Sequence, residues 1–462
     1  MNYNISKYSS NICKFIETHI KYKLNNTNFN ENKIINNISL LFSQSNPIKL
    51  EFDNTYYIEQ LHNTNYPLNY LLWNKLYNNG LAEQQFNNNL DIPNFNNFDI
   101  FYNWYNINSR LINIDNIYNN LPRKLKDYGL FINPTDTNRI NLHNEIYKNH
   151  FVPLDVQHHI ETSNLVYEKY INMIEKVSIN MYYIKNSAKP DINLITRIIS
   201  FIRKISNNYD LFVDLTIIYG HQRKELIYYP NMNILTPTNM NSGSTYPTRN
   251  ITIFRSEELY KILIHELIHY YGFDSHIYKY CFEDIKTILE KHIYLDKKYG
   301  TDQINESYTE ILAIIFHTAI MSTLLGKSFN ELINIELAFS AFQVAKLINY
   351  YDGTKFKHIF KDNKNNIKIC QTSSACSYYI IKFFMLFQLE TMLNFWDLNG
   401  FKITKNNESE YIKLYENIIL NAKENKKMKD VIKYMLNIIK THREYKTNFM
   451  MSTMRMSALE II

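Results

Sequence analysis

The stretch Ile264-His265-Glu266-Leu267-Ile268-His269 places two histidines four residues apart, with a glutamate directly after the first. On a helix, residues i and i+4 lie on one face, one turn apart, so both imidazoles can reach the same metal ion. Glu266 lies on the same side, where its carboxylate can contact a metal-bound water without ligating the metal. That is the position of a general base, so the spacing predicts a metal site with a base beside it.

The residues around the motif predict a buried helix with defined ends. Ser256, which two glutamates follow, is the expected N-cap, and Gly272 is the expected stop. Between them, Leu259 to Tyr271 is apolar nearly all round, so we expect this helix in the core. In the alternative interpretation His265 and His269 are core histidines bonded to carbonyl groups, although burying two imidazoles and a carboxylate without a metal is costly.

A second pair of carboxylates lies downstream, at the head of an apolar helix expected to run to about Leu325. Glu306 and Glu310 are four residues apart, so two like charges share one helix face, which is unfavourable without a cation nearby. The conflict is resolved if Glu306 ligates a metal and Glu310 orients a ligating histidine. The alternative is an ordinary charged first turn that complements the helix dipole.

Taken together, His265-Glu266-x-x-His269 and Asn305-Glu306-x-x-Thr309-Glu310 resemble the gluzincin zinc metallopeptidases, the thermolysin-like clan. The two parts are separated by 306 − 269 = 37 residues. The resemblance implies one Zn²⁺ held by His265, His269 and Glu306, with Glu266 activating water and Glu310 contacting His265. It also implies a protein or peptide substrate. The exopeptidase signature G-x-M-E-N is absent, which favours an endopeptidase.

The segment Asn241 to Tyr246 precedes the strand that leads into the motif helix. It contains Gly and has extended propensity, so we expect an edge strand whose free backbone groups pair with an extended peptide. The expected substrate-binding residues are Ser242, Gly243, Ser244 and Thr245; the alternative is a surface loop. This segment and the Asn-, Ile- and Tyr-rich composition also resemble uncharacterised metallopeptidase-like proteins of large DNA viruses.

The resemblance further implies an oxyanion-stabilising Tyr, His or Arg from the helical half that follows Glu306. Tyr378 and Tyr379 are candidates, because a Ser/Thr-rich cap region leads through them into the apolar helix Ile380 to Leu389. Arg455, a lone arginine among apolar neighbours, is the other candidate. In the alternative interpretation the two tyrosines simply pack in the core.

Composition limits the class of protein. With 462 residues and 45% hydrophobic content the chain can form two or three domains, and a scattered net charge of +6 argues against a nucleic-acid partner. Four cysteines without a C-x-x-C pair and an N-terminus without a signal-peptide core indicate an intracellular, cytoplasmic protein, virion-associated if it is viral. The apolar runs Ile311 to Leu325 and Tyr378 to Leu389 are expected to be buried helices, so no membrane span is predicted.

The expected fold is α+β, mostly helical, around a zincin-type core. Residues 1–155 are expected to form an N-terminal helical region, with helical patterns at Asn11 to Lys23 and Tyr66 to Tyr77. Residues 156–300 form an α/β subdomain with the edge strand and the motif helix, and residues 301–462 a helical subdomain that carries Glu306. Inside the α/β subdomain we expect helices over 162–185 and 192–206 and strands over 211–219, 225–229, 233–235 and 251–254. The alternative function is a non-catalytic structural or binding protein that retains this fold, and no oligomeric state is indicated.

Overall fold

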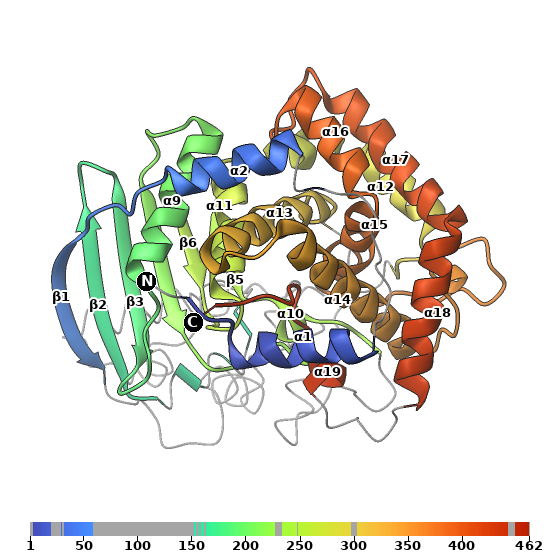
Figure 1. Cartoon of the computed structure of the whole chain (residues 1–462), viewed down its shortest axis with the longest axis horizontal. Coiled ribbons are helices and arrows are strands. Elements are labelled where there is room, and N and C mark those ends of the chain that lie inside the picture. Colours follow the sequence, from blue (N-terminus) through green and yellow to red (C-terminus); the bar gives the residue numbers. More distant parts are fainter. Residues whose placement is uncertain are drawn as a thin grey trace, which may run out of the picture.

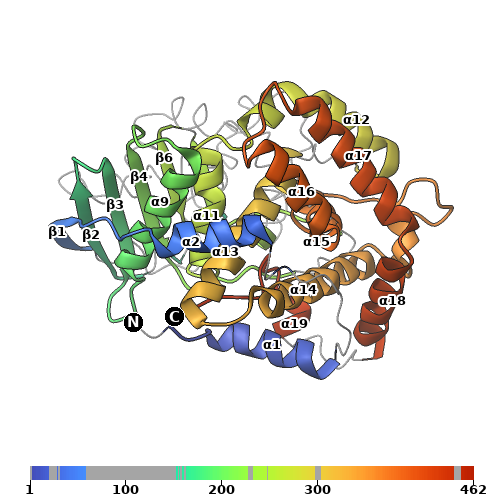
Figure 2. The same ribbon diagram turned by 45° about the horizontal axis from the view of Figure 1, so that its top comes forward.

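The chain forms an α+β structure, seen here in a computed structural model with one mixed six-stranded sheet and a helical half (Figure 1). The structure describes residues 3–19, 29, 32–58, 152–153, 156, 159–160, 163–226, 233–246, 248–296, 303–441 and 449–461. The α+β class expected from the sequence is therefore confirmed. Figure 1 and Figure 2 show the sheet on one side and helices α14 to α18 on the other, with α11 and α13 between them.

The sheet has the strand order β1-β2-β3-β4-β6-β5. Its strands are β1 (Glu51–Ile58), β2 (Leu165–Asn172), β3 (Val177–Ile184), β4 (Val213–Tyr219), β5 (Gly243–Tyr246) and β6 (Asn250–Ile253). Strands β3, β4 and β6 run parallel, whereas β1 and β2 on one side and β5 on the other pair antiparallel with their neighbours. The expected strands at 211–219 and 251–254 are confirmed as β4 and β6.

The helix expected over 162–185 is wrong, because this stretch forms the β2–β3 hairpin. Both strands are rich in β-branched and aromatic residues, which fit a pleated surface better than a helix. The turn between them is closed by Asn172, whose side chain accepts a hydrogen bond from Glu175 N, and by Lys176 in the left-handed backbone region at φ 54°. Burial along β3 from Val177 to Tyr182 outweighs the helical spacing that the sequence suggested.

The N-terminal region contributes a strand as well as helices. The helix expected from Asn11 is present as α1 (Lys7–His19), and α2 (Lys33–Ser43) follows it with Asn32 as N-cap. Strand β1 then pairs with β2 at the outer edge of the sheet, so the part of 1–155 that the structure describes is not wholly helical. The helix expected at 66–77 lies outside the described residues.

The remaining helices cover the sheet and build the helical half. They are α9 (Ile192–Ser206), α10 (Pro237–Met240), α11 (Leu259–Tyr270), α12 (Phe282–His292), α13 (Asn305–Leu325), α14 (Phe329–Tyr350), α15 (Lys382–Phe387), α16 (Leu389–Asn399), α17 (Glu408–Glu424), α18 (Lys426–Thr441) and α19 (Phe449–Ser452). The described residues also contain two π-helical turns, η1 (Ile277–Cys281) and η3 (Cys376–Ile381), and a 3₁₀ turn, η2 (Phe356–Ile359). The helix expected at 192–206 is confirmed as α9, and most of the described residues between 303 and 452 lie in helices.

Helix α11 carries the motif and packs against α13, α9, β5 and β6. It begins after Glu258, whose backbone is left-handed at φ 60°, so Ser256 is not the N-cap. The carboxylate of Glu258 is instead bonded to the N–H groups of Met456 and Ser457. The expected stop is confirmed: Gly272 has φ 67°, and its N–H donates to His269 O at 2.9 Å.

Helix α13 is long and apolar enough to cross a membrane by length and composition alone. Within the fold, 78% of its most apolar window is buried. A core helix passes the same test, and α13 packs against α11, α14 and α2.

Two of the expected short strands are reduced to single bridges. Glu225 pairs with Thr453, and Leu235 pairs with Gln371. Both therefore tie the α/β part to residues far along the chain. Residues 227–229 of the expected strand lie outside the described residues.

Candidate metal centre

Three side-chain atoms from α11 and α13 converge on one point. His265 Nε2 and His269 Nε2 are 3.1 Å apart, and Glu306 Oε2 lies 3.2 Å from the first and 3.3 Å from the second. The two histidines share one face of α11, and Glu306 enters from the first turn of α13, which packs against it. The fold therefore brings together the three ligands expected from the sequence.

The spacing of these atoms fits a tetrahedral zinc ion. With metal–ligand distances of 2.0–2.1 Å, two ligand atoms at adjacent corners of a tetrahedron are about 3.3–3.4 Å apart. The three observed separations, 3.1, 3.2 and 3.3 Å, are within 0.3 Å of that value. His265, His269 and Glu306 line one cleft, and three protein ligands would leave a zinc ion one further position, as in catalytic sites.

The other ring nitrogens explain why the three converging atoms repel one another unless positive charge lies between them. His269 Nδ1 is 2.7 Å from Asp274 Oδ2, and His265 Nδ1 is 2.8 Å from Glu310 Oε1. If each Nδ1 carries the hydrogen and faces its carboxylate, both Nε2 lone pairs point at each other and at Glu306. Three acceptors at about 3 Å repel one another unless a metal ion or extra protons lie between them.

The pKa values of the converging side chains also indicate that positive charge is favoured between them. Burial alone would lower the pKa of His269, but Asp274 and Glu306 raise it well above its usual value. Burial opposes ionisation of Glu306 as well, yet the two imidazoles hold the pKa of its carboxyl well below the usual range. Both shifts favour positive charge between the three side chains, which a divalent cation would supply in place of protons.

Glu266, the expected base, is buried beside the three ligands and is held by strand β5. Its Oε2 accepts a hydrogen bond from Thr245 Oγ1 at 2.6 Å. Burial raises the pKa of its carboxyl, against the opposing effect of His265 and His269. A Cβ at Gly243 would lie 2.6 Å from Glu266 Oε1, so the strand needs glycine at this position to admit the carboxylate.

A cleft of about 380 Å³ opens in front of the three ligands. Of the residues expected to bind substrate, Gly243, Ser244 and Thr245 line this cleft. Ser242 does not; it lines an adjoining cavity of about 30 Å³. Strand β5 is the last described strand on its side of the sheet, so the expected edge strand is confirmed.

The three residues proposed to stabilise the oxyanion lie in different places relative to the cleft. Tyr378, on the π-helical turn η3, lines the cleft, and its ring centroid lies 6.2 Å from that of His265. Tyr379 is buried and donates its hydroxyl to Met454 O at 2.6 Å, because neighbouring residues on a helix point in different directions. Arg455 is fully buried among carboxylates, with Nη1 3.1 Å from Glu460 Oε2. Tyr379 and Arg455 are therefore not at the metal centre.

The sequence did not assign a role to two polar residues of the site. Asp274 follows the Gly272 turn and accepts hydrogen bonds from His269 and, at 2.7 Å, from Asn305 Nδ2. Lys261, on α11, pairs with Glu310. The sequence offered one indication of this pair, because Lys261 is a charged residue in a helix that is otherwise apolar outside the motif.

A second group of possible ligands, His276, Cys281 and Glu408, is different in kind. His276 Nε2 is 2.5 Å from Glu408 Oε2, which is a short hydrogen bond and about 0.8 Å less than two ligands of one tetrahedral ion require. His276 and Glu408 therefore form a hydrogen-bonded pair with Cys281 nearby, and not a second centre of the same geometry.

Comparisons with known proteins add no relative: no protein-family model matches the chain, no curated protein matches its sequence, and no solved structure matches its fold.

Proposed function

We propose that this protein is a zinc-dependent metallopeptidase that cleaves peptide bonds within protein or peptide substrates. One observation supports this most: three acceptor atoms lie at the spacing of tetrahedral ligands, and a buried glutamate is held beside them by Thr245. The residues that would hold the ion are His265, His269 and Glu306. A zinc ion bound there polarises a carbonyl group and lowers the pKa of water toward neutrality.

The chain's own residues supply the remaining steps. Glu266 accepts a proton from the attacking water and then delivers it to the leaving amine nitrogen. Thr245 fixes the orientation of this carboxylate through its hydroxyl. Tyr378, at the wall of the cleft, is the residue from which a hydroxyl can donate to the developing oxyanion.

Strand β5 supports binding of an extended peptide. Phe254 N donates to Ser242 O at 2.9 Å, so these opposite residues form a hydrogen-bonded pair. Such pairs alternate in antiparallel sheets, so Gly243 and Thr245 belong to pairs that are not bonded to β6. Their N–H and C=O groups point to the free edge of the sheet, where a substrate backbone can pair with them.

Metal content and cleavage test this function together. Purified protein should contain one zinc per chain and cleave members of a peptide library, and a chelator should abolish cleavage. His269→Ala should lose the zinc, whereas the control His276→Ala, outside the centre, should retain it.

Glu266→Gln should retain the zinc and the fold but lose turnover by at least about two orders of magnitude. Stoichiometric zinc in His269→Ala would overturn the ligand assignment. Zinc binding without cleavage of any peptide would instead favour the non-catalytic binding protein.

A further inference from the structure

Residues 453–461 cross the interior of the protein without forming a helix of their own. From Thr453 to Leu459 no residue is more than 5% exposed. Buried backbone groups must find hydrogen-bond partners, and here secondary structure supplies few of them. Side chains of other elements therefore have to hold this segment.

Two buried carboxylates bind the backbone N–H groups of the 453–461 segment. Glu258 accepts from Met456 N at 3.0 Å and from Ser457 N at 2.5 Å. Glu336, on α14, accepts from the next two N–H groups at 3.0 and 3.2 Å. On the other side of the segment, Lys382 Nζ donates to Met456 O at 2.7 Å.

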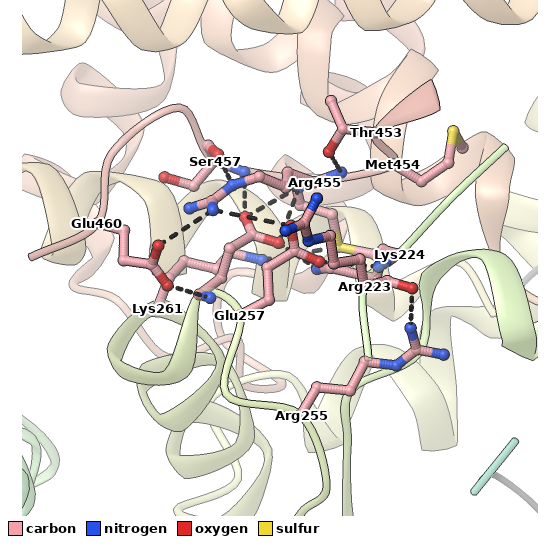
Figure 3. Close-up of polar contacts among 12 residues, drawn as sticks. Arg223, Lys224, Arg255, Glu257, Lys261, Thr453, Met454, Arg455, Ser457 and Glu460 are labelled. Atoms are coloured by element: carbon pink, nitrogen blue, oxygen red, sulfur yellow. Dashed lines mark hydrogen bonds and ion pairs between the residues drawn. The ribbon is translucent and has the colours of Figure 1, made fainter. Parts of the chain in front are cut away.

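The same contacts tie the segment to the start of the motif helix. Glu258 directly precedes α11, and its N–H donates to Glu460 Oε1 at 2.7 Å. Lys224 forms an ion pair with the Glu258 carboxylate. Figure 3 shows Arg455, Ser457 and Glu460 of the segment beside Lys224 and the α11 residue Lys261.

Lys261 links the segment to the metal centre. Its Nζ lies 3.7 Å from Met456 Sδ and forms a buried ion pair with Glu310 Oε1. The same Glu310 oxygen lies 2.8 Å from His265 Nδ1, a close charge contact that lies off the direction of a hydrogen bond from the ring nitrogen. The other oxygen of Glu310 has no hydrogen-bond partner among the described residues, so the contacts of Oε1 fix the orientation of the carboxylate.

We propose that Lys261 is a positioning residue of the metal centre and that the 453–461 segment acts on the centre through it. The proposal rests on the metal site of the proposed function. A carboxylate bonded to a ligating histidine fixes its ring and increases its basicity, and loss of such a partner weakens metal binding by about 10- to 100-fold. Without Lys261, Glu310 can turn from His265 toward Lys382, the other ammonium group that acts on it.

The test measures the zinc dissociation constant by competition with a chromophoric chelator, and the absorption spectrum of the Co²⁺ form. Lys261→Met should weaken zinc binding by about 10- to 100-fold and alter the Co²⁺ spectrum, because the His265 ring is no longer fixed.

Arg203→Met is the matched control. Arg203 is a buried cation on α9 that donates to the carbonyl oxygens of Glu175, Lys176 and Leu211, all outside the 453–461 segment. Replacement of this cation by Met should leave the dissociation constant and the Co²⁺ spectrum as in the unmodified protein.

A second variant separates positioning from loss of fold, because removal of one partner of a buried ion pair can unfold a protein. Lys261→Met/Glu310→Gln removes both charges, and the amide oxygen of Gln can still accept from His265. The metal-free form should melt close to the unmodified protein, while zinc binding stays at least about 10-fold weaker. Unchanged zinc binding in both Lys261 variants would overturn the proposal.

A second pair of variants tests whether the 453–461 segment acts on the centre through Met456. Met456→Ala removes the contact with Lys261, whereas Met450→Ala changes a buried methionine just before the segment. Weaker zinc binding in Met456→Ala alone supports transmission through Met456, and equal dissociation constants in the two variants overturn it. If the unmodified protein binds no zinc, the proposed function itself fails, whereas zinc binding that is insensitive to Lys261 overturns only the positioning role.

Discussion

At the scale of single residues, the two motif imidazoles depend on carboxylates that the motif does not contain. Glu310 and Asp274 each face one Nδ1 atom, so both rings present Nε2 to the same point. Asn305 holds Asp274 in place through Nδ2. The geometry of the centre is therefore set by the turn after α11 and the start of α13 as much as by α11 itself.

Asp274→Asn tests this arrangement. The amide oxygen can still accept from His269 Nδ1, but the negative charge is lost, so zinc binding should weaken by about 10- to 100-fold. Competition with a chelator measures this. The control Asp214→Asn changes a carboxylate on β4 that accepts from Asn180 at 3.2 Å, and it should keep full affinity. Equal affinities in the two variants would show that the Asp274 charge is not needed.

The sequence was most informative where spacing alone carries the chemistry. The spacing along one turn of helix is enough to predict that His265, Glu266 and His269 act together. The i, i+4 spacing of two carboxylates likewise indicated Glu306 and Glu310. Asp274 was missed because a turn separates it from the helix, and no periodicity extends across a turn. The prediction that Tyr379 or Arg455 lies at the centre was wrong, because residue type does not reveal which way a buried side chain points.

At the scale of elements, strand β5 is the part of the structure that serves the cleft. Its alternate residues have different tasks: Ser244 bonds to β6, whereas Thr245 turns its backbone to the free edge and its hydroxyl to Glu266. A four-residue strand can therefore support the sheet and the site at once.

Proline variants separate these tasks. Thr245→Pro removes an N–H that points away from β6. Its KM should be about fivefold higher than that of Thr245→Val, because one hydrogen bond contributes about 1 kcal/mol. Thr245→Val keeps the N–H but frees Glu266, so it should lower kcat with little change in KM. Ser244→Pro removes a bond to β6 and should lower the melting temperature. Steady-state kinetics with one peptide measures the first two effects, and equal KM values in the two Thr245 variants would exclude the backbone contact.

The β2–β3 hairpin shows the limit of periodicity for whole elements. The stretch over 165–184 contains enough apolar residues at helical spacing to suggest a helix, yet it pairs along its full length as two strands. What decides is the parallel partner β4, which lies about thirty residues further on and buries Val177 to Tyr182. Such a long-range pairing cannot be predicted from the local pattern of apolar residues.

At the scale of the whole molecule, distant parts of the chain meet around a charged interior. Ile5 forms a bridge with Ile461, and Ser6 Oγ donates to Glu460 Oε2 at 2.8 Å. The sequence indicates no role for residues 453–461 beyond the candidate Arg455, because side chains from many elements hold them.

Lys346 in this interior should make stability depend on pH. Burial lowers the pKa of its amine from 10.5 to about 7. Between these values the unfolded chain binds one proton more than the folded protein, so the free energy of unfolding should rise with pH. Below about pH 7 the amine is charged in both states and this dependence ends.

Denaturant unfolding at pH 7 and pH 9.5 measures the effect. From the lower to the higher pH the unmodified protein should gain up to about 3 kcal/mol relative to Lys346→Met, which lacks the group. Parallel pH dependence of the two proteins would mean that the Lys346 amine is not depressed in the folded state.

The order of synthesis places the 453–461 segment after all the residues of the candidate metal centre. The ribosome makes the ligand residues, 265 to 306, about 150 residues before Met456 and its neighbours. A nascent chain that has exposed only the ligands cannot yet place Glu258 and Lys261, whose contacts include residues not yet made. A metal ion that bound these ligands before residue 456 was made would therefore meet a centre in which Met456 does not yet contact Lys261.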